Sequence, residues 1–328
     1  MKILFLLELG GKMYNKTERD EKYIKKLNTV LETEYGFEPV SIFPAIRGYY
    51  GETWKVISSS DIYFVKIDYF PRHKEKFKNS LPVVNYLYNN GINFINRVIE
   101  TVDRKLYSTF NNGIIAGFNW IEGINIELDE TKASEYEMLG KIYPLTKQGF
   151  NIPILSFNSE MADELYIKWN LLKKVCDRNK NSSLLNLLEK NKDILDNSAK
   201  RLEYFSNQCK DDKSDFFFTH GDAGGNFIAS ESHNYIVDWD EVMYAPVERD
   251  AWVMCHKDWA RELFNRNLRN NGIEYSLKSE RLAFFIYHMF FLYLNEFIDD
   301  YLTFGSSEGV LSYFDDFMIE RVEYADTL

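Results

Sequence analysis

Residues 218–250 read FTHGDAGGNFIASESHNYIVDWDEVMYAPVERD, and this stretch decides the expected fold and chemistry. A short glycine-containing run carries Asp222 and Asn226, and a predicted β-strand at 235–237 then leads into Asp238. Magnesium prefers oxygen ligands and keeps few protein groups beside phosphate oxygens and water. Two carboxylates and a carboxamide arranged in this way suit a site that holds Mg²⁺ against a polyphosphate, while one carboxylate accepts a hydroxyl proton.

Asp222 is the candidate general base, because a carboxylate beside a substrate hydroxyl can accept its proton and orient it for in-line attack. Gly-Asp-x-Gly is also good turn chemistry, so Asp222 taken alone fits an ordinary turn. Its linkage to Asn226 and Asp238, the candidate metal ligands, favours function, because this is the base-and-metal layout of the protein-kinase catalytic loop. We interpret His220 as a structural residue that hydrogen-bonds backbone near the loop. Asp240 either supports the metal ligands or begins an exposed loop.

Lys66 lies in the otherwise apolar strand IYFVKID, where an unpaired buried lysine would be costly. A cation at this position makes sense if it meets phosphates and a carboxylate. Glu75, nine residues later on a predicted helix, is the best candidate partner. Because strand faces alternate, Lys66 could instead point outward. Glu75, in RHKEKFK, could likewise belong to a solvated helix face.

Two further segments are candidates for nucleotide contacts. Gly48 and Gly51, in IRGYYGETW, mark a turn that could lie over phosphates, although an ordinary hairpin explains them equally well. Phe118, Trp120 and Ile121 belong to a strand end that could offer backbone groups to an adenine edge.

The composition fits an enzyme built from two domains or lobes. At 328 residues the chain is long enough for two, and its 45% hydrophobic and 27% charged residues are ordinary for a soluble globular protein. The net charge of -11 disfavours nucleic acid as a partner, because a phosphate backbone needs a basic face. The same charge permits a cationic substrate, although it can equally serve solubility alone.

Three features favour a cytoplasmic protein. Cys176, Cys209 and Cys255 are odd in number and lack metal-ligand spacing, which suits a reducing compartment. The apolar run at the N-terminus is interrupted by Glu8, so it is too short for a membrane span and poor as a signal peptide. No other long apolar segment stands out, and we expect no membrane partner. The oligomeric state is left open.

The pattern of elements predicts an α+β first third followed by a mainly helical remainder. We expect a helix at 18–35, three strands between 41 and 67, a helix at 73–90 that Pro82 kinks or divides, and further strands up to residue 120. Helical spacing then dominates, except for a strand-rich insert around 215–240. The expected helices lie near 131–147, 160–177, 183–208 and 278–303. The change in pattern puts the boundary near 119–124, giving lobes at 1–121 and 122–328.

At this point the residues resemble a known family. The motif HGDAGGN followed by IVDWDEVMYAPVERD is similar to the aminoglycoside phosphotransferase and choline kinase family. Within that family, its sequence most resembles the spectinomycin phosphotransferase-like branch. The resemblance extends from about residue 35 to the C-terminal helices, and only the block at 218–250 is highly specific. It implies a bilobal protein-kinase-like fold, with an antiparallel sheet plus helix in the nucleotide-binding N-lobe and a mainly helical C-lobe that carries the catalytic loop and substrate site.

Carried over residue by residue, the resemblance implies Asp222 as catalytic base and Asn226 and Asp238 as magnesium ligands. It further implies Lys66 as the lysine that meets the nucleotide phosphates, with Glu75 as its helix partner. The segment at 118–121 would be the nucleotide hinge. The chain departs from the family in one place, because only three residues separate base and asparagine, where many members have four. Glycines could let the shorter loop reach the same positions.

The leading hypothesis is an ATP- or GTP-dependent, Mg²⁺-assisted kinase that phosphorylates a hydroxyl of a small molecule. An aminoglycoside or aminocyclitol antibiotic fits the resemblance and the acidic charge, while choline, homoserine or a sugar amine would make it a metabolic kinase. A nucleotide-binding pseudokinase is a second class, supported by the short loop and opposed by the complete set of Lys66, Asp222, Asn226 and Asp238. A metal-dependent phosphohydrolase would need more ligands than the sequence offers.

Overall fold

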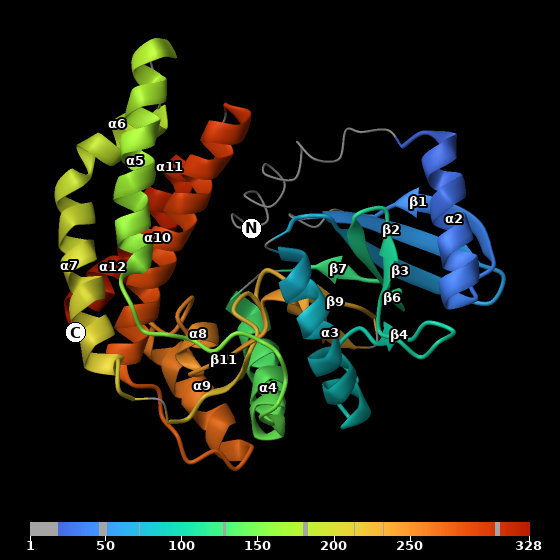
Figure 1. Ribbon diagram of the computed structural model, residues 1–328. Coiled ribbons are helices and arrows are strands. Elements are labelled where there is room, and N and C mark those ends of the chain that lie inside the picture. The colour runs from blue at the N-terminus through green and yellow to red at the C-terminus, as the bar shows by residue number, and fades with distance from the viewer. Residues whose placement is uncertain are drawn as a thin grey trace. The chain divides into compact units, whose positions relative to one another are not determined.

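The protein is described by a computed structural model that covers residues 19–45, 51–71, 73–126, 129–179, 183–212, 214–231, 233–305 and 309–328 (Figure 1). Gly48 and the N-terminal apolar run lie outside these ranges. The chain divides into two compact units, a first unit of Met1–Pro153 with His220–Met243 and a second unit of Ile154–Thr219 with Tyr244–Leu328. The expected lobe boundary near residue 121 stays a prediction. The run that carries Asp222 belongs to the first unit.

The first unit is built on an antiparallel sheet in the order β1-β2-β3-β6-β4, with β5 also paired to β6. Its strands are β1 (Pro39–Pro44), β2 (Gly51–Ser58), β3 (Ile62–Asp68), β4 (Val98–Ile99), β5 (Ser108–Phe110) and β6 (Gly113–Asn119). The sheet and the helix beside it are those expected from the sequence. β6 is buried over almost its whole length, which places it, with β3, at the centre of the sheet.

Helix α2 (Glu21–Tyr35) packs its apolar side against the sheet. Asp20 caps the helix by accepting the Tyr23 N–H, and Gly36 ends it in a left-handed conformation. Leu27 and Leu31 are fully buried, and they share a core cluster with residues of β2, β3 and β6. Because Val65 and Ile67 of β3 belong to this cluster, the alternating residues of that strand project from its other side.

The second helix of the first unit is α3 (His73–Asn89), which runs without interruption although it contains Pro82. Its Phe77 lies near Phe118 of β6, with ring centroids 6.5 Å apart. A small sheet of order β10-β9-β7 completes the unit, together with α4 and three short 3-10 turns. The bounds are β7 (Ile124–Asn125), β9 (Phe227–Ala229), β10 (Asn234–Ile236), α4 (Lys132–Ile142), η1 (Asp129–Thr131), η2 (Tyr143–Leu145) and η3 (Trp239–Glu241).

The second unit is mainly helical, as the sequence predicted. The expected helical segment at 183–208 is divided into α6 and α7 at Asn191, and α9 and α12 lie outside the ranges expected for the long helices. The elements are α5 (Glu160–Asn179), α6 (Ser183–Lys190), α7 (Lys192–Cys209), α8 (Glu248–Ala251), α9 (Asp258–Asn270), α10 (Ser279–Phe304), α11 (Val310–Ser312), a π-helical segment η4 (Tyr313–Met318), α12 (Ile319–Asp326), and the paired strands β8 (Phe217–Thr219) and β11 (Met243–Ala245).

Helix α10 is the core of the second unit. Within the described ranges it is the one helix long and apolar enough to cross a membrane, but most of its apolar window is buried by the protein itself. Phe284, Phe290 and Leu294 have no exposed surface, and the helix packs against α5 and α7. A core helix therefore accounts for its hydropathy.

A buried polar network ties α8 to the start of α10. Glu248 has no exposed surface, and its Oε1 accepts hydrogen bonds from the Tyr275 hydroxyl (2.6 Å) and the Lys278 backbone N–H (2.7 Å). Arg281 donates to the Tyr275 hydroxyl (3.1 Å) and pairs with Asp212 (2.8 Å). These contacts supply partners for buried charges, as stability requires, and they give Glu248 a structural role in the second unit.

Two histidines should make the second unit sensitive to acid. Burial lowers the pKa of His288 to about 4, and burial followed by the nearby Arg321 lowers the pKa of His256 to about 4. The unfolded chain takes up these protons near pH 6.5 and the folded one does not, so the free energy of unfolding should fall as pH drops from about 6.5 to 4. The slope should be about 1.4 kcal/mol per pH unit for each histidine.

Urea unfolding of the wild type and of His288→Phe between pH 7 and pH 4.5 measures this slope. Phenylalanine keeps the stacking with Phe284 and cannot titrate, so the variant should lose stability less steeply on acidification. Parallel curves for the two proteins would contradict the assignment.

Candidate active site

The run between β8 and β9 brings Asp222 and Asn226 together in spite of its short length. The Nδ2 of Asn226 donates to the backbone carbonyl of Asp222 (2.9 Å) and to its Oδ2 (3.1 Å). Both partners are acceptors, so the orientation of the amide is defined and its Oδ1 is left to face another ligand. The Val237 N–H also donates to the Asn226 carbonyl (3.0 Å), which joins the loop to the segment that precedes Asp238.

Gly225 explains how three intervening residues suffice. A Cβ atom at this position would lie 2.7 Å from Oδ1 and 3.1 Å from Oδ2 of Asp222. Carbon and oxygen do not approach so closely, so the carboxylate of Asp222 rests directly on the glycine backbone. The second glycine of the run is therefore required by the position of the candidate base.

His220 has the structural role that the sequence suggested. Its Nδ1 accepts the backbone N–H of Asp222 (3.2 Å), so Nε2 carries the proton that is donated to the Val237 carbonyl (2.9 Å). The ring is almost fully buried and packs edge-on against Trp239. His220 thus fixes the candidate catalytic loop to the residue immediately before Asp238.

Lys66 forms the electrostatic centre of the site. It lies on β3 between β2 and β6, on the side of the strand opposite Val65 and Ile67, and only 6% of its surface is exposed. Its Nζ lies 2.8 Å from Oδ1 of Asp238 and 2.6 Å from Oδ2 of Asp240. The sequence alternative of an outward-facing lysine is therefore wrong, and two carboxylates compensate its burial.

Asp238 has an unusual backbone conformation, with φ at 62°. A non-glycine residue with positive φ is uncommon, and such residues are often held at functional sites by the surrounding structure. The conformation turns the chain out of the small sheet into η3, so that Asp238 and Asp240 both reach the same ammonium group. The Asp238 side chain stays 38% exposed, whereas that of Asp240 is 9% exposed.

The two carboxylates differ in their protonation behaviour. Burial raises the pKa of Asp238, but the attraction of Lys66 outweighs it and holds the net pKa below the usual range. Burial, opposed by Lys66 and reinforced by Asp238, raises the pKa of Asp240 to about 6. Burial lowers the pKa of Lys66, but the attraction of Asp238 and Asp240 outweighs it and holds the pKa above its ordinary value. At neutral pH one ammonium therefore faces two carboxylates, and the surplus negative charge suits a divalent cation.

The predicted pairing of Lys66 with Glu75 does not form. Glu75 lies on the exposed side of α3, and its carboxylate is 3.4 Å from Lys78. The register of the helix is the reason. His73, at its first position, turns inward toward Asp68 and η3, which leaves the residue two places later in solvent.

A cavity of about 270 Å³ lies beside Lys66 within the first unit. Phe118, Trp120 and Ile121 all line it, as expected for a strand end that meets a ligand, and so do Asn226 and Asp238. Gly51 is not among the lining residues. A Cβ on Gly51 would lie 2.3 Å from the Ile67 carbonyl, so close strand pairing accounts for this glycine.

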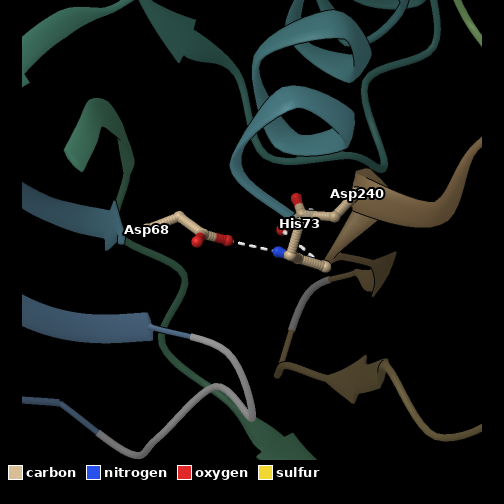
Figure 2. A group of neighbouring side chains, drawn as sticks. All are labelled: Asp68, His73 and Asp240. Atoms are coloured by element: carbon tan, nitrogen blue, oxygen red, sulfur yellow. Dashed lines mark hydrogen bonds and ion pairs between the residues drawn. The ribbon is translucent and has the colours of Figure 1, made fainter. Parts of the chain in front are cut away.

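Asn125 was missed from the sequence, and so were the contacts of His73 with Asp68 and Asp240. Asn125 on β7, which is among the residues that line the cavity, donates to the Gly225 carbonyl (2.8 Å), and its buried Oδ1 has no hydrogen bond to any described residue. Asp68, His73 and Asp240 form a second buried group, with His73 lying between the two carboxylates (Figure 2). Because Asp240 is far in sequence from Asp68 and His73, only the fold brings the three together.

Comparison with known proteins identifies the fold. No protein-family model matches the chain, and no curated protein sequence matches it. Among solved structures it is similar to spectinomycin phosphotransferase in complex with ADP and spectinomycin, with a TM-score of 0.71, 19% identity, and coverage of 92% of this chain and 97% of that one.

Two further structures extend the likeness. Amicoumacin kinase in complex with AMP-PNP and Ca²⁺ gives a TM-score of 0.60 at 14% identity, covering 95% of each chain. Choline kinase from Cryptosporidium parvum gives 0.54 at 11% identity, covering 99% of this chain and 97% of that one. The predicted kinase-like α+β fold, and its resemblance to aminoglycoside phosphotransferases and choline kinase, are confirmed.

Replacing Lys66, the positively charged residue at the centre of the site, tests whether its ion pairs stabilise the fold. Lys66→Met leaves Asp238 and Asp240 facing each other without a counter-charge, so we expect a loss of about 3 kcal/mol in the free energy of unfolding. Glu75→Gln, an exposed change, should stay within about 0.5 kcal/mol of wild type. Urea unfolding of both variants provides the measurement. Equal effects would mean that Lys66 is not held as described.

Proposed function

We propose that the protein is an ATP- or GTP-dependent phosphotransferase that moves the γ-phosphate to a hydroxyl of a small molecule. The observation that carries the proposal is one cavity lined by the buried Lys66, its two aspartate partners and Asn226, whose amide holds the candidate base Asp222. Phosphoryl transfer needs little covalent chemistry from the protein. It needs positioning and charge stabilisation, which this set of side chains can supply.

The nucleotide would occupy the cavity beside Lys66. Phe64, Phe118 and Ile228 offer apolar surface for a base, and the Ile121 N–H, which has no hydrogen bond to a described residue, offers a donor for its edge. The buried Oδ1 of Asn125 would accept a ribose hydroxyl. Lys66 would meet the phosphates by exchanging one of its carboxylate contacts for a phosphate oxygen.

The donor set fits a magnesium ion. Asn226 has its Nδ2 occupied by Asp222, which leaves Oδ1 as a neutral oxygen ligand, and the partly exposed carboxylate of Asp238 provides a charged one. Mg²⁺ binds through few protein oxygens when substrate phosphates and water complete its shell. When bound, it would neutralise charge on the phosphates during transfer. Lys66 and Asn226 would orient the triphosphate, and Asp222 would align the acceptor hydroxyl.

Asp222 is suited to the role of base because its carboxylate is exposed and yet fixed by Asn226 and Gly225. It would hold the acceptor hydroxyl for in-line attack and accept its proton as the new P–O bond forms. The fixed geometry also weakens the pseudokinase alternative, because the short loop keeps the asparagine in contact with the base.

The favoured acceptor is an aminoglycoside or aminocyclitol. This choice rests on the likeness to spectinomycin phosphotransferase and on the net charge of -11, which suits a cationic substrate. Such an activity would confer antibiotic resistance in the cytoplasm, and three buried free cysteines are compatible with a reducing compartment. Choline kinase has the same fold, so a metabolic alcohol is the second candidate.

Nucleotide turnover tests the function directly. Wild type should hydrolyse ATP or GTP slowly with Mg²⁺, and it should consume the nucleotide faster by phosphorylating a true acceptor from a panel of spectinomycin, kanamycin, choline and homoserine. Asp222→Asn and Asp238→Ala should each lower the rate by about 10²-fold or more, because they remove the base and a metal ligand. Asp103→Asn, which changes an exposed carboxylate elsewhere in the first unit, serves as the control. Unchanged rates in both site variants would refute the proposal.

The glycine of the catalytic loop provides a second test. In Gly225→Ala the added Cβ would stand 2.7 Å from Oδ1 of Asp222, so the carboxylate must shift, and a misplacement approaching ~1 Å costs on the order of 10²-fold in rate. Mg·ADP should still bind, since Lys66 and Asp238 are untouched. We expect calorimetry to show a dissociation constant near that of wild type alongside the reduced turnover. Full activity in this variant would show that Asp222 does not need its present position.

A further inference from the structure

His73 is a buried side chain that no sequence pattern pointed to and that the proposed mechanism does not use. It is the first residue of α3, and 7% of its surface is exposed. Its Nδ1 hydrogen-bonds Oδ2 of Asp68, while Nε2 lies 3.9 Å from Asp240 and 3.6 Å from Glu241 (Figure 2). The imidazole therefore connects the end of β3 to η3.

Asp68 is fixed more firmly than any other member of this group. It has no exposed surface, and its Oδ1 accepts the Phe70 N–H (2.8 Å) while Oδ2 meets His73. An ionised carboxylate only accepts hydrogen bonds, so Nδ1 of His73 carries a proton in its contact with Asp68. This fixes the plane of the ring and aims its other nitrogen at η3. Nε2 stands at ion-pair rather than hydrogen-bond distance from Asp240 and Glu241, so its attraction for them needs a proton on Nε2 as well. Lys76, one turn further along α3, binds both oxygens of Glu241 (2.9 and 2.8 Å) and holds the same segment.

The two carboxylates that contact Lys66, those of Asp238 and Asp240, respond differently when a metal–nucleotide complex binds. Under the proposed function, Asp238 turns its charge toward the metal, so it can no longer compensate Lys66 fully. Asp240 is the remaining partner, and its Oδ2 lies 2.6 Å from Nζ. A lysine that must meet phosphates in a buried site needs one carboxylate that stays in place.

We propose that His73 is a positioning residue, which holds Asp240 against Lys66 and so performs through η3 the task that a helix glutamate was expected to perform directly. The proposal rests on the proposed nucleotide function and deepens it by naming the residues that orient the lysine. Asp68 fixes His73, His73 fixes Asp240, and Asp240 fixes Lys66. Helix α3 is thus coupled to the phosphate-binding lysine without Glu75.

The same three side chains could also hold a metal ion, since their ligand atoms lie within 4.8 Å of one another. The lysine argues against this reading, because Oδ2 of Asp240 is already in contact with an ammonium group. A cation bound there would lie beside Lys66 and be repelled by it. A binding assay with Zn²⁺ distinguishes the two cases.

Two substitutions at position 73 distinguish the contact that Nδ1 makes with Asp68 from the contact that Nε2 makes with Asp240. In His73→Asn the amide nitrogen takes the place of Nδ1, so the contact with Asp68 survives and the one with Asp240 is lost. In His73→Gln the amide nitrogen takes the place of Nε2, so the reverse holds. His233→Asn makes the same change at an exposed position of the first unit and serves as the control. The readouts are the Kd for Mg·ADP by calorimetry, KM and kcat for ATP hydrolysis, and the urea midpoint.

We expect His73→Asn and Asp240→Asn to raise the Kd for Mg·ADP and the KM for ATP by about tenfold, the usual range for residues that orient a ligand-binding group. His73→Gln should stay within about threefold in KM even though its urea midpoint falls. The proposal is overturned if His73→Asn matches wild type, if KM follows the urea midpoint in all variants, or if Zn²⁺ binds stoichiometrically and His73→Asn abolishes that binding. Wild type that fails to bind Mg·ADP would refute the proposed function itself.

Discussion

The buried ammonium group of Lys66 is the constraint on which the rest of the first unit depends. Removing a lysine from water is unfavourable unless carboxylates compensate it, and here Asp238 and Asp240 do so at 2.8 and 2.6 Å. Both come from a segment more than 170 residues later in the chain, so the ion pairs fix the run at 220–243 to the central strand of the sheet. The positive φ of Asp238 and the contacts of His220 follow from this requirement.

Much of the fold could be predicted because its signals are local. The apolar spacing around Leu27 and Leu31 specified α2, and Gly36 marked its end. The expected sheet, the helix that contains Pro82 and the strand-rich insert all appear, since period and turn chemistry act over a few residues. The division of α6 from α7 at Asn191 was missed, because neither glycine nor proline marks it.

The candidate site was predictable only where chemistry was concentrated in one short stretch. Asp222, Asn226 and Asp238 stand within 17 residues; Asn226 hydrogen-bonds Asp222, and Asn226 and Asp238 line one cavity. The partner of Lys66 was not predictable, because one residue of helix register decides whether position 73 or 75 faces inward. Glu75 looked suitable by charge, whereas the fold gave the inward position to His73 and the pairing to Asp240. Asn125 carried no signal, since its role depends on a strand contact with a distant loop.

The most direct test of this account is a crystal structure of the protein with Mg²⁺ and AMP-PNP. One metal ion should lie about 2.1 Å from both Oδ1 of Asn226 and a carboxylate oxygen of Asp238. In the same complex, Lys66 should contact a phosphate oxygen while it keeps its bond to Asp240. A nucleotide bound away from Lys66, or a metal ion that touches neither side chain, would contradict it.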